Sequence, residues 1–283
     1  MRRPISPVVL LLIIIAVAAV LLVWLQTSQK PAPRALAAAV PIVTTGGACN
    51  GAVLPAAPKV LDPAKAVGAQ DFCHAFYLVA YSPGLRDPLW SGEKLTAAMA
   101  KAGDTFKRPK QTFVLEHDLA RADQGSNGDY VRSGYDRGHM TPAADAPDPD
   151  AESDTFVMTN VVPQTKVLNE HLWERLEVKV RALAVAQGEI FIVTGPIFDA
   201  TPQRLGGRIA VPVATFKAVL VPRTHQAIVL VASNTNTPAC ETVSLDELKR
   251  RAGVDAFPGL ALASGATGLE GACATAMAEA AKG

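Results

Sequence analysis

The densest group of polar side chains in the sequence is the segment 133–145, which contains Asp136, Arg137 and His139. Phosphodiester hydrolysis needs a base for water, positive charge on the developing phosphorane and a metal ion at the leaving oxygen. His139 could supply the base and Arg137 the charge, because residues i and i+2 of an extended segment point the same way. The glycine between them relieves crowding. A turn with an Asp136–Arg137 ion pair beside a surface histidine is the alternative interpretation.

A second polar group, Asn160, Asn169 and Glu177, follows along the chain. Its last two members lie where apolar residues recur at three- and four-residue spacing, which predicts an amphipathic helix through Leu168, Leu172, Leu176, Val180 and Leu183. At 100° per residue Asn169, Trp173 and Glu177 share one side of this helix, the last turned by about 80° from the first. These three side chains could therefore border one site.

Asn169 is a reasonable metal anchor, because an amide oxygen is a hard, neutral ligand and Mg²⁺ keeps several of its waters. Glu177 lies about 12 Å further along the helix axis, which favours contact with the ion through water. The alternative is a polar residue at a helix N-terminus for Asn169 and an ion pair with Arg181 for Glu177.

Short apolar runs of strand type surround the predicted helix, which Gly188 is expected to end. The predicted strands are Phe76–Tyr81, Phe113–Leu115, Phe156–Thr159, Ile190–Thr194, Ile209–Val211, Thr215–Val221 and Ala227–Ala232. Residues 104–134 otherwise form a predicted surface loop. Several strands around one central helix indicate an α+β domain.

The N-terminus carries an apolar run long enough to cross a bilayer. Residues 7–25 are 19 consecutive apolar residues preceded by Arg2 and Arg3, and about 20 residues span a bilayer core. Because flanking arginines favour the cytoplasmic side, we expect a cytoplasmic segment 1–6 and a transmembrane signal anchor over 7–25. The rest of the chain would then lie on the periplasmic or extracellular side. A signal peptide cleaved near the small residues 35–39 is the alternative.

Beyond this run, we expect a linker and lead-in over 26–65, a globular domain over 66–262 and a small-residue tail over 263–283. The net charge is +1 for the whole chain. It is −1 without residues 1–25, since 27 minus 2 leaves 25 basic residues against 26 acidic ones. Nucleic-acid binders normally cluster Lys and Arg, so attraction for phosphate must be local.

The four cysteines permit three disulfide pairings, and an exported domain could keep them oxidised. No two cysteines form a Cys-x-x-Cys motif, which gives a zinc site or a redox motif little support.

Together the motifs resemble those of the DNA/RNA non-specific endonuclease family, the endonuclease G-like ββα-metal nucleases. The resemblance covers roughly residues 70 to 260. It rests on Asp-Arg-Gly-His at 136–139, Asn-x-x-Pro-Gln at 160–164, Asn-x-x-x-Trp at 169–173 and the Leu-Glu pair at 176–177, with further similarity at 193–197, 216–217 and 244–248.

The resemblance implies a central mixed or antiparallel sheet with flanking helices, and sequence-independent cleavage of DNA and RNA to 5′-phosphate products. It implies Mg²⁺ as the cofactor, with Mn²⁺ as an alternative. The implied roles are general base for His139, phosphate stabilisation for Arg137, magnesium ligand for Asn169, support of the active site for Asn160 and water-linked acid for Glu177. A neutral base predicts that activity falls as pH drops through the histidine pKa, which is about 6.5 when unperturbed.

The family's upstream active-site arginine corresponds to either Arg108 or Arg121, and the resemblance favours disulfides Cys240–Cys273 and Cys49–Cys73. The sequence leaves the oligomeric state open, with a homodimer among the options. Two other functions compete with a nuclease: a non-catalytic extracellular nucleic-acid-binding module of the same fold, and a secreted phosphodiesterase with another substrate.

Overall fold

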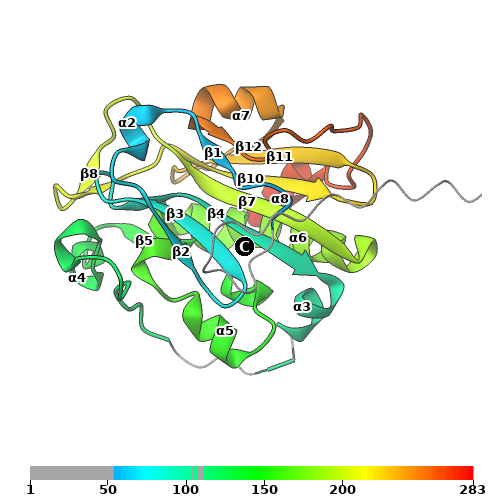
Figure 1. The fold of residues 1–283 in the computed structure, drawn as a ribbon. Helices are drawn as coiled ribbons and strands as arrows, with labels where there is room; N and C mark the ends of the chain where they lie inside the picture. The colour runs from blue at the N-terminus through cyan, green and yellow to red at the C-terminus, as the bar shows by residue number, and fades with distance from the viewer. Residues whose placement is uncertain (1–53, 104, 107–110, 283) are drawn as a thin grey trace, which may run out of the picture. The chain divides into compact units, whose positions relative to one another are not determined.

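A seven-stranded antiparallel sheet forms the centre of the protein in the computed structural model, which describes residues 54–103, 105–106 and 111–282 (Figure 1). The strand order is β12-β11-β10-β7-β4-β3-β2, and every neighbouring pair is antiparallel. The strands are β2 (Gln70–Cys73), β3 (Tyr77–Ser82), β4 (Asp87–Thr96), β7 (Glu189–Ile197), β10 (Ala214–Val221), β11 (Gln226–Ser233) and β12 (Cys240–Val243). This confirms the α+β class and the antiparallel sheet.

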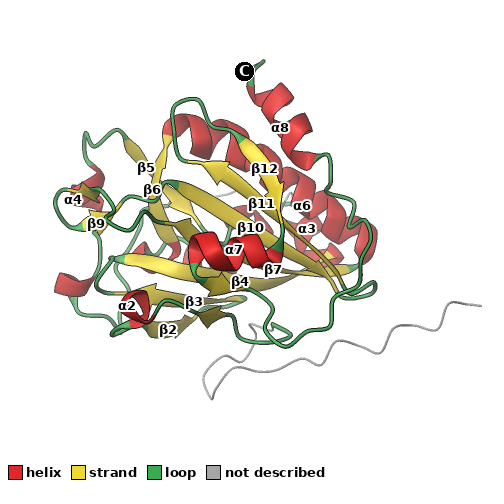
Figure 2. Ribbon diagram, turned by 90° about the horizontal axis from the view of Figure 1, so that it is seen from above, coloured by secondary structure: helices red, strands yellow, loops and turns green. Residues whose placement is uncertain are grey.

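The two faces of this sheet carry separate apolar clusters because side chains alternate along each strand. In β7, Phe191 and Val193 join the cluster that contains α7 (Leu245–Ala252). Ile190 and Ile192 join the cluster on the other face, with α6 (Glu174–Gln187). Figure 2 shows α7 and α6 on opposite sides of the sheet.

A two-stranded antiparallel ribbon of β5 (Tyr135–His139) and β6 (Val161–Thr165) forms a separate sheet that packs against the main one. Between the ribbon and α6 the chain forms η4, a π-helical turn over Leu168–Trp173. The remaining short elements are β1 (Lys59–Val60), α2 (Pro63–Ala66), α3 (Ala97–Ala102), η1 (Arg121–Asp123), α4 (Asn127–Tyr130), η2 (Ala143–Asp145), α5 (Pro149–Asp154), η3 (Met158–Asn160), β8 (Arg204–Leu205), β9 (Ile209–Ala210), β13 (Val254–Asp255) and α8 (Ala272–Ala280).

The predicted helix and most predicted strands are confirmed, but two strand predictions are wrong. Residues 158–160 form the 3₁₀ helix η3 instead of a strand. Phe113–Leu115 contributes only one isolated bridge, between Val114 and Val157. Three strands of the main sheet, β2, β4 and β12, have no counterpart among the predictions, because charged residues or proline interrupt their apolar patterns.

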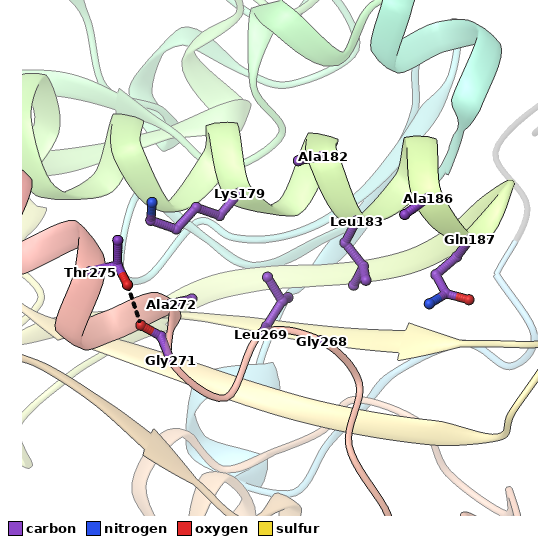
Figure 3. A pocket seen from close by; sticks show the side chains of 10 residues that line it. All are labelled: Lys179, Ala182, Leu183, Ala186, Gln187, Gly268, Leu269, Gly271, Ala272 and Thr275. Carbon is purple, nitrogen blue, oxygen red and sulfur yellow. Dashed lines mark hydrogen bonds between the residues drawn. The ribbon is translucent and has the colours of Figure 1, made fainter.

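The segments on either side of the predicted domain 66–262 also pack against it. Before this range, Leu54 is buried in the cluster that contains α7, and β1 pairs with β13. After it, α8 is tied to β12 by the disulfide Cys240–Cys273, which confirms that predicted pairing. The Lys179 Nζ lies 3.1 Å from the Glu279 carboxylate, linking α6 to α8. Figure 3 shows the groove where residues 268–275 lie along α6.

The expected cytoplasmic segment 1–6 and most of the expected linker 26–65 lie outside the described residues, and two further expectations fall wholly or partly outside them. The predicted transmembrane segment 7–25 is one of them, and no helix among the described residues is long and apolar enough to cross a membrane. The other is the pairing of Cys73: this residue is disulfide-bonded, and Cys49, its expected partner, is not among the described residues.

Candidate active site

The β5–β6 ribbon carries the Asp-Arg-Gly-His motif, and His139, the last residue of the motif, lines a surface cavity. In the register, Arg137 pairs with Pro163 and His139 with Val161. A Cβ atom at Gly138 would clash with the Gln164 side chain, so a larger residue here would displace that side chain from its buried position. The crowding that the glycine is predicted to relieve therefore comes from a close contact across the ribbon, with the Gln164 side chain of β6.

Asn160 holds the turn that follows His139. Its Oδ1 accepts a hydrogen bond from the Thr141 backbone N–H at 3.0 Å, and its Nδ2 donates to the carbonyls of Thr141 and Thr155 at 2.9 and 3.1 Å. The Met140 N–H donates to the Asn160 carbonyl at 2.8 Å. Because Asn160 is fully buried and both ends of its amide are engaged, it supports the turn after His139 without lining the cavity.

Two phenylalanine rings enclose the imidazole of His139. The ring centroids of Phe113 and Phe156 lie 5.1 and 4.8 Å from that of His139. The isolated bridge between Val114 and Val157 holds the two phenylalanine segments together. Within it, the Val114 N–H donates to the Phe156 carbonyl at 2.9 Å. Burial, aided by the charge of Arg137, lowers the pKa of His139 to about 4. The Nε2 atom has no hydrogen-bond partner among the described residues, and the lowered pKa keeps the imidazole neutral.

Arg137 lies on the same side of β5 as His139, as its i+2 spacing predicts. Its guanidinium carbon lies 5.1 Å from the ring centroid of Phe113 and 5.4 Å from that of Tyr130. These cation–π contacts orient the guanidinium plane without using its N–H donors. No ion pair between Arg137 and Asp136 occurs in the described part of the chain, so the turn interpretation of the motif is wrong.

The helical segment brings Asn169 and Glu177 to the cavity that His139 and Phe156 line. Trp173 does not join them: it is 1% exposed and packs in the cluster beneath α6. The π-helical turn explains the difference, because its wider i→i+5 spacing aligns Asn169 with Glu174, which also lines the cavity. The structure thus brings His139, Asn169 and Glu177 to one cavity, whereas the predicted place of Trp173 is wrong.

The charged side chains of Lys217, Asp145 and Arg181 act on Glu177 at the cavity. Lys217 Nζ donates to Thr194 Oγ1 at 2.9 Å and lies 5.3 Å from the Trp173 ring centroid. Arg181 donates to the buried carboxylate of Asp145 at 3.1 Å. Burial raises the pKa of Glu177 to about 7, opposed mainly by the charge of Lys217.

Sequence reasoning missed Phe113, Phe156 and Lys217 as parts of the site. Lys217 could have been identified from the sequence, because it is the single charged residue in the apolar strand Ala214–Val221. Of the two candidate upstream arginines, Arg121 is exposed in η1, and Arg108 lies outside the described residues.

Comparison with known proteins decides the family. The model of the DNA/RNA non-specific endonuclease family matches residues 63–263. The chain belongs to this family. It is 32% identical over 210 residues to Nuclease C1 of Cunninghamella echinulata var. echinulata, covering 67% of this chain and 83% of that protein.

Other members agree in sequence and in fold. The chain is 28% identical over 242 residues to mitochondrial endonuclease G of Bos taurus, covering 79% of this chain and 80% of that protein. A solved structure described as the EndoG/EndoGI complex superposes with a TM-score of 0.61 at 26% identity, covering 68% of this chain and 86% of the matched chain. Family membership supports nuclease activity.

The donor atoms around Asn169 fit a hard divalent cation. The amide Nδ2 donates to Asp136, which leaves Oδ1 as a neutral oxygen ligand at the cavity. The Glu177 carboxyl lines the same cavity. Few protein ligands and several retained waters are the usual coordination of Mg²⁺. Asn169 would therefore hold the ion, and Glu177 would accept hydrogen bonds from its waters.

Glu177, instead of His139, is expected to set the acid limb of the pH profile. The pKa values of about 7 for Glu177 and about 4 for His139 mean that the carboxyl is protonated first as pH falls. Below pH 7 we therefore expect kcat/KM to drop about tenfold per pH unit, while the imidazole stays neutral. This replaces the limb near 6.5 expected for an unperturbed histidine.

The measurement is kcat/KM on a short fluorescent DNA between pH 4.5 and 9 at constant Mg²⁺ concentration. In Glu177→Gln, which has lower activity but no titrating group at this position, the limb near pH 7 should disappear. A limb that persists in Glu177→Gln would assign it to another group.

Proposed function

We propose that the protein is a metal-dependent endonuclease that hydrolyses phosphodiester bonds of DNA and RNA to 5′-phosphate products. The observation that carries this proposal is the shared cavity, which the side chains of His139 and Asn169 both line; the Nε2 atom of His139 has no hydrogen-bond partner among the described residues. Mg²⁺ is the proposed ion, with Mn²⁺ as an alternative. A bound ion of this kind would neutralise charge on a non-bridging oxygen and on the leaving 3′-oxygen.

The side chains of His139 and Arg137 carry out the other catalytic roles in this proposal. His139 Nε2 accepts a proton from the attacking water, and the two phenylalanines keep the imidazole neutral until then. Arg137, held by its ring contacts, donates hydrogen bonds to the phosphate as negative charge builds. None of these groups reads a base edge, which agrees with cleavage independent of sequence.

Digestion of three substrates by the purified protein tests this proposal: plasmid DNA, RNA and a small aryl phosphodiester. We expect both nucleic acids to be cut. Because the products should carry 5′-phosphates, polynucleotide kinase should label their 5′ ends only after phosphatase treatment. Cleavage restricted to the aryl ester would favour a phosphodiesterase with another substrate. Retention of plasmid in a gel shift without any cleavage would favour a binding module.

We further propose that residues 7–25 anchor the protein in a membrane, with the catalytic domain on the periplasmic or extracellular side. The uncharged run of these residues supports this, and the disulfide Cys240–Cys273 agrees with an oxidising compartment. The full chain should remain in the membrane pellet after carbonate washing. Recovery of all the protein in the soluble fraction would reject the anchor and favour cleavage.

A further inference from the structure

Asp136 is the acidic residue of the Asp-Arg-Gly-His motif that the steps above leave without a role. Its Oδ2 accepts a hydrogen bond from Asn169 Nδ2 at 3.2 Å. This contact joins β5 to η4, which lie on different sides of the β6 strand in sequence. It is the only hydrogen bond that the Asn169 side chain makes within the described residues.

The chemistry of the two groups fixes the orientation of the amide. An asparagine side chain has a donor end and an acceptor end, and rotation about its last bond exchanges them. A carboxylate can only accept hydrogen bonds, so Asp136 binds the NH₂ end alone. The carbonyl oxygen is then turned away from Asp136 and toward the cavity. A charged acceptor also makes this bond stronger than one between neutral groups.

We propose that Asp136 is a positioning residue that holds the Asn169 amide with its oxygen toward the cation and so sets metal affinity. This inference rests on the proposed metal-dependent function. The hydrogen bond acts in two ways: it removes the orientation in which NH₂ faces the ion, and it polarises the amide so that its oxygen becomes a better ligand. Ligand-orienting partners of this kind typically change metal affinity by about 10- to 100-fold.

Direct titration of the purified full chain with Mn²⁺, followed by the electron paramagnetic resonance signal of the free ion, tests the proposal without any substrate. In Asp136→Ala we expect Mn²⁺ to bind about 10- to 100-fold more weakly than in the wild type. Asp136→Asn keeps the shape of the side chain and can still offer a carbonyl oxygen, so its affinity should lie between the two. Saturating Mn²⁺ should restore kcat of Asp136→Asn to within about threefold of wild type.

Glu170→Gln is the matched control. Glu170 follows Asn169 in η4 and lines the same cavity, so this variant removes one negative charge from the cavity without touching the amide bond. We expect its Mn²⁺ affinity to change less than about threefold. Circular dichroism melting of all three variants shows that the comparison is between folded proteins.

The outcomes separate this inference from the proposed function. A wild-type protein that binds no Mn²⁺ and cuts nucleic acid without it would overturn both. A wild type that binds Mn²⁺, together with unchanged affinity in folded Asp136→Ala and Asp136→Asn, would overturn the role of Asp136 alone. Equal weakening by Glu170→Gln would also overturn it, because cavity charge would then account for the effect.

Discussion

Replacement of His139 by alanine is expected to lower kcat on plasmid DNA by about 10²- to 10⁴-fold, the usual contribution of a general base. Among the described residues, the rings packed on the imidazole offer no substitute base. Phe113 and Phe156 flank it, and neither can accept a proton. Initial rates of supercoil loss at saturating Mg²⁺ give the measurement.

His117→Ala is the control for this variant. The His117 side chain is 96% exposed, and it does not line the cavity. It should cut plasmid at the wild-type rate. Mn²⁺ affinity should be nearly unchanged in His139→Ala, because the base acts on water and does not hold the ion. Plasmid cleavage by folded His139→Ala at more than a tenth of the wild-type rate would mean that another group serves as the base.

Removal of divalent cations by EDTA is expected to abolish cleavage of both DNA and RNA. Without an ion, the uncharged amide of Asn169 cannot neutralise the negative charge that develops on the leaving oxygen. Only Arg137 is then left to offset the negative charge that builds on the phosphate. Activity should return on addition of Mg²⁺ or Mn²⁺ in excess over the chelator. Ca²⁺, which prefers more oxygen ligands than one amide and a carboxylate offer, should restore it less well.

The Asn169→Ala variant shows whether EDTA acts by removing the bound ion or by damaging the protein in another way. This variant should behave in Mg²⁺ as the wild type does in EDTA, with a melting temperature close to that of the wild type, because Asn169 is only half-buried. Full activity in EDTA-dialysed protein would contradict metal dependence.

The local parts of the site could be predicted from sequence because they rest on short-range chemistry. Two-residue alternation placed Arg137 and His139 on one side of an extended segment, and Gly138 indicated a crowded position between them. Helical spacing located the segment that carries Asn169 and Glu177. The disulfide Cys240–Cys273 followed from the family resemblance and not from the residues alone.

Long-range features were not predictable, because each depends on a partner distant in sequence. The strand β4 contains Glu93, a carboxyl that is 1% exposed, and charge inside a strand hides its apolar alternation. Phe113 encloses the base only because Val114 bridges to Val157 across the loop. Trp173 was misplaced for a different reason: a spacing of 100° per residue holds in an α-helix but not in a π-helical turn.

The π-helical turn at Leu168–Trp173 also bears on how this chain could change in evolution. Loss of one residue within the turn would let the backbone form regular i→i+4 hydrogen bonds continuous with α6, a more favourable helix. The same deletion would rotate the preceding side chains by about 100° and carry Asn169 out of the cavity. Selection for a more stable helix and selection for the present site would thus favour chains that differ in length by one residue, and only the longer chain would keep Asn169 at the cavity.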